Sequence, residues 1–153
     1  MLVKSSGPQG AQDPFQLLRF VLAILAGIVV AYGLGQAIEF GLVVFVNGSV
    51  PQDSMQYFAV RNHPQVLVAK LFYSAVIGLG AGYLAAWIGG RMGILAGIAL
   101  AFAQVVGIVW AMISRNPLFS YTPLWTWLLL LLITPPAMIV GAWIRGRRYI
   151  TQD

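Results

Sequence analysis

The sequence contains no cysteine and very little charge. Without cysteine the chain has no disulfide bond, no thiol nucleophile and no cysteine-ligated metal site. Charged residues make up 8% of the 153 residues and hydrophobic residues make up 59%. Because a soluble domain has about a quarter of its residues charged, this chain lacks the polar side chains that a water-exposed surface needs. The composition therefore predicts that the chain lies in lipid.

Acidic residues are the scarcest charged group, with four Asp and Glu against nine Lys and Arg, which gives a net charge of +5. Such an excess can indicate nucleic-acid binding when it forms a basic patch. Here the basic residues stand mostly at the ends of apolar runs, where the positive-inside rule expects them. We therefore expect the lipid bilayer as a partner, and no nucleic acid.

Four apolar runs predict the fold. We expect helices over about 15–46, 66–88, 93–113 and 123–145, each long enough to cross a hydrocarbon core of about 30 Å. Together they form a transmembrane domain over 14–148. The short turn around Arg91 requires an antiparallel helical hairpin. The fold class is all-α: an integral membrane bundle of four transmembrane helices.

The segments outside these runs are polar. Residues 1–13 are rich in Ser, Gly, Pro and Gln and predict a mobile cytoplasmic tail. Asp13 is expected to cap the first helix and Pro14 to begin it, and the run that follows is too long for a cleavable signal peptide. A second tail is expected over 149–153.

The longest predicted loop, 47–65, faces the outer side and contains a candidate interfacial element. Ser49 before Pro51 indicates a helix start, and Asn62-His63-Pro64 indicates its end. Between them, apolar side chains favour a short amphipathic helix on the membrane surface: Met55, Tyr57, Phe58 and Val60.

The distribution of basic residues predicts the orientation of the bundle. Six fall on the side of the termini: Lys4, Arg19, Arg91, Arg145, Arg147 and Arg148. Three fall on the other side: Arg61, Lys70 and Arg115. Because Lys and Arg concentrate in cytoplasmic segments, we expect both termini inside.

Small residues recur at intervals of four along the first three runs. Since hydrocarbon provides no hydrophobic force between helices, small residues that permit close backbone approach favour contact. The predicted helix-packing residues are Gly27, Gly35, Gly78, Gly82, Gly93 and Gly97. They are expected to pack within one bundle, or alternatively against a second copy or another membrane subunit.

Two charges are predicted to lie at similar membrane depth. Glu39 stands near the end of the first helix and Lys70 near the start of the second, so both lie below the outer boundary. An unpaired charge at that depth is costly, so we predict a Glu39–Lys70 contact. The alternatives are that both side chains extend to the head groups, or that Glu39 couples to protons or cations. Gln36 shares the Glu39 face.

Two further polar features lie within the later runs. Gln104 is expected to form a hydrogen bond to a neighbouring helix, with substrate contact as the alternative. Pro135 and Pro136 remove two backbone donors and predict a kink, which in some transporters marks a binding site.

No complete catalytic or metal motif is present. His63 is the single histidine and has no second ligand at metal spacing. No nucleophile and orienting acid stand in a recognisable arrangement around it. We therefore expect no catalytic residue, no metal site and no cofactor.

Several short motifs match a known pattern. They are Gly78-Leu79-Gly80-Ala81-Gly82, Gly89-Gly90-Arg91, Asn116-Pro117-Leu118-Phe119, Pro135-Pro136-Ala137 and Gly141-Ala142. In these motifs the stretch from Leu67 to Gly146 resembles a group of small, uncharacterised bacterial four-helix inner-membrane proteins. The resemblance implies a multi-pass protein of the bacterial cytoplasmic membrane, and it implies no activity.

The expected role is that of a non-enzymatic accessory or scaffold component of the membrane. The alternative is a small oligomeric transporter or channel that uses Glu39 and Gln104. A transporter needs polar groups that converge on one cavity, whereas a packing subunit needs Glu39 paired and Gln104 bonded between helices.

Overall fold

A computed structural model describes residues 14–114 and 122–150 of the chain. Within these ranges every regular element is a helix, so the all-α prediction is confirmed for them. The elements are α1 (Pro14–Asn47), α2 (Ser54–Arg61), α3 (Pro64–Gly89), the short 3-10 helix η1 (Gly90–Met92), α4 (Gly93–Ile113) and α6 (Leu124–Ile150).

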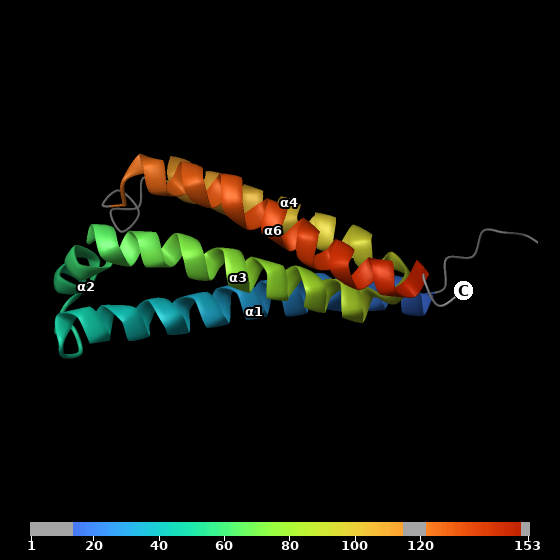
Figure 1. The fold of residues 1–153 in the computed structure, drawn as a ribbon, viewed down its shortest axis with the longest axis horizontal. Helices are drawn as coiled ribbons and strands as arrows, with labels where there is room; N and C mark the ends of the chain where they lie inside the picture. The colour runs from blue at the N-terminus through green and yellow to red at the C-terminus, as the bar shows by residue number, and fades with distance from the viewer. Residues whose placement is uncertain (1–13, 115–121, 151–153) are drawn as a thin grey trace, which may run out of the picture.

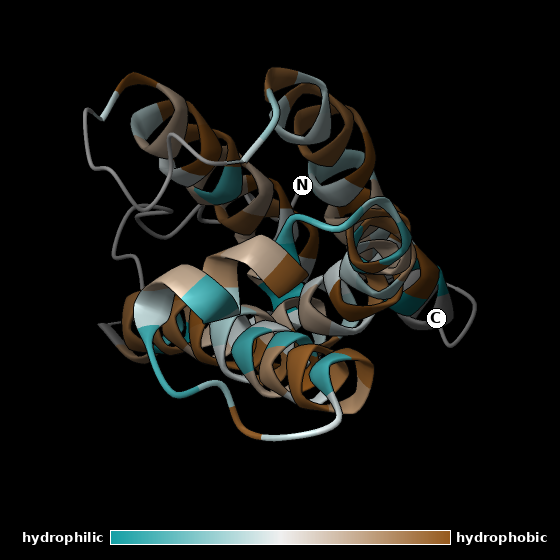
Figure 2. Cartoon of the chain, turned by 90° about the vertical axis from the view of Figure 1, so that its left-hand side faces the viewer, coloured by the Kyte–Doolittle hydropathy of each residue, from teal (hydrophilic) through white to brown (hydrophobic). Residues whose placement is uncertain are grey.

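Three helical stretches are long and apolar enough to cross a membrane: residues 15–47, 64–113 and 124–147. The second contains α3 and α4, which turn back on each other at η1 and lie antiparallel (Figure 1). Large apolar side chains are exposed on these helices. Figure 2, coloured by hydropathy, shows that hydrophobic residues make up much of each long helix. Exposed apolar surface of this extent is incompatible with water, so the helices suit a multi-pass membrane protein.

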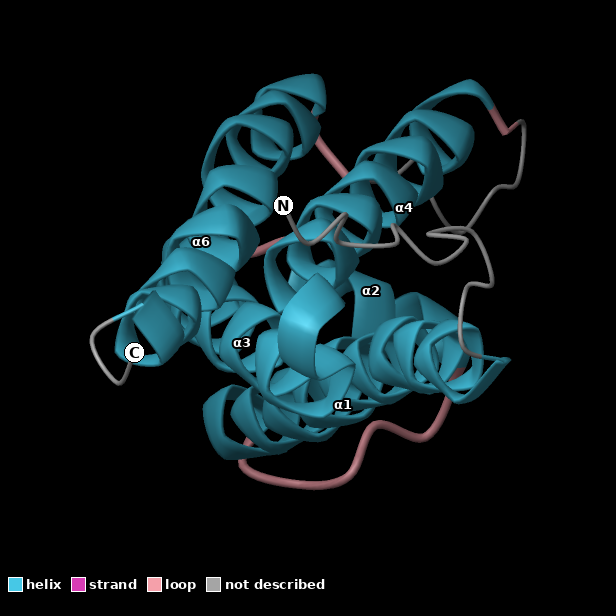
Figure 3. Cartoon of the chain, turned by 90° about the vertical axis from the view of Figure 1, so that its right-hand side faces the viewer, coloured by secondary structure: helices cyan, strands magenta, loops and turns pink. Residues whose placement is uncertain are grey.

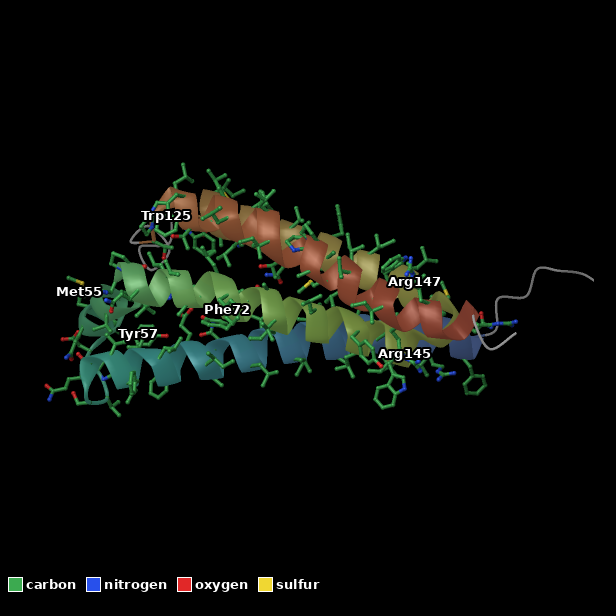
Figure 4. All side chains as sticks on the ribbon, in the orientation of Figure 1. Met55, Tyr57, Phe72, Trp125, Arg145 and Arg147 are labelled. Atoms are coloured by element: carbon green, nitrogen blue, oxygen red, sulfur yellow. The ribbon has the colours of Figure 1, made fainter. Side chains whose placement is uncertain are left out.

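The long helices form two pairs. α3 packs between α1 and α6, and α4 packs on α6 (Figure 3). The pairs α1/α3 and α4/α6 lie close at the end that carries Arg145 and Arg147 and diverge toward the end that carries α2 (Figures 1 and 4). The closed half contains a core of small and medium apolar residues: Ala81, Ala85, Leu100, Ala101 and Met138.

Glycines set the close approach of α3 to α6. A side chain at Gly82 would overlap the backbone carbonyl of Met138, and one at Gly141 would overlap the carbonyl of Leu79. At Gly78 an added Cβ would lie 3.2 Å from the carbonyl oxygen of Thr134. Packing through backbone atoms is the contact that small residues permit between membrane helices.

Of the other glycines predicted to pack between helices, three contact a neighbouring element and one does not. Gly93 lies against the carbonyl of Ala86 inside the α3–α4 hairpin, and Gly97 and Gly27 lie against side chains of α6 and α4. These predictions, like those for Gly78 and Gly82, are confirmed as packing within one bundle. Gly35 does not pack within the bundle, because no atom of a neighbouring element lies within 4 Å of the place where its Cβ would be. Its packing against a second copy or another subunit stays a prediction.

A short helix forms in the predicted loop, as α2, but begins later than expected; its place on the membrane surface stays a prediction. Its cap is Asp53, whose carboxylate accepts a 2.7 Å hydrogen bond from the backbone N–H of Gln56. The predicted start at Ser49 is therefore wrong, since an Asp side chain satisfies the free N–H groups of the first turn at Asp53 instead. The predicted end is confirmed: α2 ends at Arg61 and α3 begins at Pro64.

α6 departs from its predicted bounds at the C-terminal end. It continues to Ile150, past the predicted end at 145 and into the predicted tail. It also runs through Pro135 and Pro136 without ending, so the helix is not broken there and the predicted kink stays a prediction. Pro14 begins α1 as expected. The predicted tail over 1–13 and the Asp13 cap lie outside the described residues.

Candidate functional site

A cluster of charged and phenolic groups surrounds the carboxylate of Glu39. This side chain is buried in α1, with 3% of the residue exposed. Arg61 Nε lies 2.6 Å from its Oε1 atom, and Lys70 Nζ forms an ion pair with its Oε2 atom. Tyr57 donates a 3.2 Å hydrogen bond to Oε1, and Tyr73 donates a 3.3 Å bond to Oε2. Three hydrogen bonds and two ion pairs from two other helices therefore stabilise the charged carboxylate.

The local folds explain how these groups meet. Glu39 lies eight residues before the end of α1 and Lys70 six residues after the start of α3, which places them roughly 12 and 9 Å from those helix ends. Tyr73 follows Lys70 by three residues and so lies on the same face of α3. α2 lies at the open end of the bundle and directs Arg61 and Tyr57 inward to the carboxylate. Figure 4 labels Tyr57 at this end.

The pKa of the Tyr57 hydroxyl is raised above its ordinary value. Partial burial of the side chain is the larger cause, and the negative charge of Glu39 is the next. Both disfavour the phenolate. The hydroxyl therefore stays protonated at neutral pH and continues to donate to Glu39.

The cluster carries a surplus of positive charge. Arg61 and Lys70 supply two cations, and Glu39 supplies one carboxylate. The chain has four acidic residues; two are at positions 13 and 153, outside the described residues, and Asp53 caps α2. Among the described residues no second acidic side chain shares the cluster.

A cavity of about 350 Å³ lies beside the cluster, between the two helix pairs. One wall is polar and comes from α1, α2 and α3. The facing wall, from α4 and α6, is mostly apolar and includes Trp127 and Leu130. The residues that line the cavity and carry polar groups are Tyr32, Gln36, Glu39, Arg61, Lys70, Tyr73, Ser74, Gln104, Trp110, Trp127 and Thr134.

The polar residues singled out from the sequence meet at this cavity. Glu39, Lys70, Gln36 and Gln104 all line it, and the Glu39–Lys70 contact is confirmed. Gln104 does not form the expected interhelical hydrogen bond with any residue that the structure describes. Pro135 and Pro136 do not line the cavity, although Thr134 beside them does.

Thr134 adds an unsatisfied polar group. Its hydroxyl oxygen is buried and has no hydrogen-bond partner within the described part of the chain. Buried polar groups normally have a partner, so an unpaired hydroxyl beside a cavity indicates a place where a further group or water is accommodated.

Three participants were not anticipated from the sequence. The sequence indicates Arg61 only as an outer-loop charge, whereas it is 7% exposed and forms an ion pair with Glu39. Tyr57 was assigned to the membrane surface. The spacing of Tyr73 from Lys70 gave a usable signal, because residues three apart share a helix face. The position of Arg61 depends on how α2 folds back, which no local pattern reports.

The cavity wall between α1 and α4 contains exposed residues. Tyr32 of α1 is 55% exposed and Trp110 of α4 is 68% exposed. The Tyr32 hydroxyl would lie 3.3 Å from a Cβ placed at Gly107, so this tyrosine reaches across to α4. On this side the cavity is bordered by side chains that also contact the surroundings of the bundle.

Within the described ranges, no three His, Cys, Asp or Glu side chains come together as a metal site would require. Comparisons with protein-family models, with curated proteins and with solved structures returned no match. The site is therefore interpreted from its own geometry.

Proposed function

We propose that this chain is a non-enzymatic membrane protein that binds a small amphipathic molecule in the cavity between its helix pairs. The observation that supports the proposal is the set of polar side chains on that cavity that form no hydrogen bond with the part of the chain that the structure describes. Gln36, Ser74 and Gln104 come from three different helices and form no hydrogen bond with the described residues. Converging polar groups in a mostly apolar cavity are typical of a small-molecule site.

The helix packing supports the same proposal. Glycines bring α3 and α6 into backbone contact in the closed half of the bundle. In the open half Gly35 has free space around it, although it belongs to the same small-residue pattern. A protein whose helices served only to pack together would gain dispersion energy by closing this space. Instead α2 and the Glu39 cluster occupy the open end.

Glu39 is proposed to act as a fixed anchor and not as a proton carrier. Each of its two oxygens has one cationic partner in an ion pair and one phenolic donor. A carboxylate so surrounded is held in its charged form. Its role is to tie α2 and α3 to α1 and to hold the two cations beside the cavity.

We further propose that the chain crosses the bacterial cytoplasmic membrane four times, with both ends in the cytoplasm. The distribution of basic side chains supports this orientation. Arg145 and Arg147 lie at the end opposite α2 (Figure 4), the end where Arg91 also stands between α3 and α4. Arg61 and Lys70 are bonded to Glu39 and so are withdrawn from the outer surface, which strengthens the asymmetry.

A role as an accessory subunit is the second candidate, and one observation favours it. Gly33, Ala37 and Gly41 follow one another at intervals of four on the exposed surface of α1. No atom of a neighbouring element lies within 4 Å of a Cβ placed at either glycine. Small residues at this spacing suit contact with a helix of another subunit. Replacing Gly33 by Ile should separate such a partner on blue-native gels, while the matched exposed Gly80→Ile in α3 should not.

The binding proposal is tested by filling the cavity. Gly35→Leu places a side chain in the open space beside Gln36 and Glu39, whereas Gly80→Leu adds the same side chain at an exposed position off the cavity. Both variants and the unaltered chain are purified from membranes in mild detergent and weighed by native mass spectrometry. We expect a small bound molecule on the unaltered chain and on Gly80→Leu, and its loss from Gly35→Leu. An unaltered chain with no bound molecule, or equal retention by Gly35→Leu, would contradict the proposal.

A further inference from the structure

We propose that the cavity binds an amphiphile with an anionic oxygen head group, a carboxylate or a phosphate, attached to an alkyl chain. Lys70 and Arg61 would hold the head group, and the α4 and α6 wall would contact the chain. This inference rests on the proposed binding function and names the class of ligand.

The charge of the site selects the head group. Glu39 neutralises one of the two cations and leaves one positive charge in excess at membrane depth. Inside a membrane an unbalanced charge is costly and is normally paired. No other acidic side chain of the described residues lines the cavity, so the negative charge that would balance the cluster is assigned in this proposal to a ligand. An anionic ligand restores neutrality, and a cationic one would worsen the imbalance.

The unbonded donors suit an oxyanion. Lys70 carries three N–H groups and Arg61 five, more than the single carboxylate of Glu39 uses. The amides of Gln36 and Gln104 and the hydroxyl of Ser74 also border the cavity without partners among the described residues. Carboxylate and phosphate oxygens accept several such bonds at once.

The depth of the groups orients the ligand. Lys70 lies roughly 9 Å from the outer end of α3, and Met138 lies fourteen residues into α6, roughly 21 Å from its outer end. The cavity therefore extends from the charged cluster near α2 toward apolar residues near the middle of the bundle: Ala31, Ile77 and Met138. A head group at Lys70 with its chain directed inward has the same polarity as a lipid of the outer leaflet.

The exposed residues between α1 and α4 indicate the route of entry. Tyr32 and Trp110 both line the cavity and remain more than half exposed on the outside of the bundle. Their surroundings in a membrane are lipid chains. A ligand that reaches the cavity along this side arrives from the bilayer, which agrees with an amphiphile and not with a water-soluble anion. With a volume of about 350 Å³ the cavity holds the head group and part of a chain.

The test uses tryptophan quenching by brominated amphiphiles. Trp110 and Trp127 line the cavity, so the other tryptophans (Trp87, Trp125 and Trp143) are replaced by Phe to isolate their signal. The full chain is placed in nanodiscs of zwitterionic lipid and titrated with 9,10-dibromostearate, with its neutral glycerol ester and with a brominated alkyl trimethylammonium. We expect saturable quenching by the anion at a concentration at least ten times lower than by the other two.

Variants and competitors locate the head group. Lys70→Gln should raise the concentration of dibromostearate for half-quenching at least tenfold, Lys70→Arg should restore it, and Arg91→Gln removes the same charge far from the cavity and should have no effect. Dodecyl phosphate should compete, whereas inorganic phosphate and acetate should not. If Lys70→Gln fails to fold, the comparison of anionic, neutral and cationic probes on the chain that keeps Lys70 still tests the assignment of the head group.

Three results would contradict different parts of the proposal. Equal quenching by the anionic, neutral and cationic probes overturns the assignment of the head group and leaves the binding function standing. Competition by inorganic phosphate or acetate at the same concentration overturns the alkyl-chain assignment in favour of a free anion. Absence of saturable quenching by every probe, together with an empty cavity in native mass spectrometry, overturns the proposed function itself.

Discussion

Lys70 of α3 forms an ion pair with Glu39 of α1, 31 residues earlier in the chain. The pair joins the two helices at the end of the bundle where they diverge from α4 and α6 (Figure 1). Arg61 binds the other oxygen of the same carboxylate and so attaches α2 to this junction. One buried carboxylate therefore connects three helices, and the stability of the open end depends on it.

The first prediction concerns which of two substitutions in this cluster destabilises the folded chain more. Glu39→Gln keeps the shape of the side chain but leaves two buried cations without a counter-charge, and it should destabilise the folded chain by about 3 to 5 kcal/mol. Lys70→Gln leaves Arg61 paired with Glu39, one cation with one anion, so it should lower the free energy of unfolding clearly less. The measurement is thermal unfolding in detergent, followed by intrinsic fluorescence.

The control for this pair is Asp53→Asn, which removes an acidic group outside the bundle. Asn also caps helices well, so little change in stability is expected. If Lys70→Gln destabilises the chain more than Glu39→Gln does, the cluster does not carry the surplus positive charge inferred from its geometry.

The second prediction concerns the contact between α3 and α6. Gly82→Ala places a methyl group where the Met138 carbonyl lies, so the two helices must separate and the melting temperature should fall. Gly80→Ala lies two residues away in the same helix with open space around it, and it should be neutral or stabilising by about 0.5 to 1 kcal/mol. A similar fall in melting temperature for both variants would contradict the role of close helix approach, because Gly80 has no neighbouring helix at that distance.

Part of this structure follows from the sequence by elementary counting. The apolar runs gave the helices to within a few residues, because a membrane span needs about 20 apolar residues. Glu39 and Lys70 were paired by their depth alone, since α1 and α3 are antiparallel and meet at one loop. Gly82 and Gly97 were identified from spacing, because only small residues permit backbone contact.

The parts that were not predicted depend on tertiary geometry. Arg61 joins Glu39 because α2 folds over the end of the bundle, and its residue pattern shows only an amphipathic turn. Gly35 matches the spacing of a packing glycine, yet it lies where the helix pairs diverge, and a Cβ placed there would have no atom of a neighbouring element within 4 Å. The divergence itself, which creates the cavity, has no signature in any one helix.

The third prediction concerns alkaline pH. The pKa of Tyr57 is raised above 10.0 by burial and by Glu39, so the folded chain holds this proton more tightly than the unfolded chain does. Its contribution, about 1 kcal/mol for one hydrogen bond, is complete below pH 10 and is lost as the pH rises through the raised pKa. The difference in melting temperature between the unaltered chain and Tyr57→Phe should therefore narrow above pH 10.

A matched control for the alkaline experiment is Tyr83→Phe, thirteen residues beyond Lys70 in α3 and roughly 20 Å away along the helix. This variant gives the effect of losing a tyrosine hydroxyl far from Glu39 over the same pH range. A difference for Tyr57→Phe that stays constant from pH 8 to pH 11 would contradict the hydrogen bond to Glu39.

The fourth prediction concerns topology, and the absence of cysteine makes it directly measurable. Single cysteines at Gln16 and Arg91 mark one end of the bundle, and single cysteines at Ser49 and Gln65 mark the other. With four crossings and both termini inside, a membrane-impermeant maleimide added to intact bacterial cells with a permeabilised outer membrane should label Ser49→Cys and Gln65→Cys. Gln16→Cys and Arg91→Cys should react after the inner membrane is opened, because the positive-inside rule retains the arginine-rich end in the cytoplasm. Labelling of Gln16→Cys and Arg91→Cys on opposite faces would be incompatible with an antiparallel bundle that crosses the membrane four times.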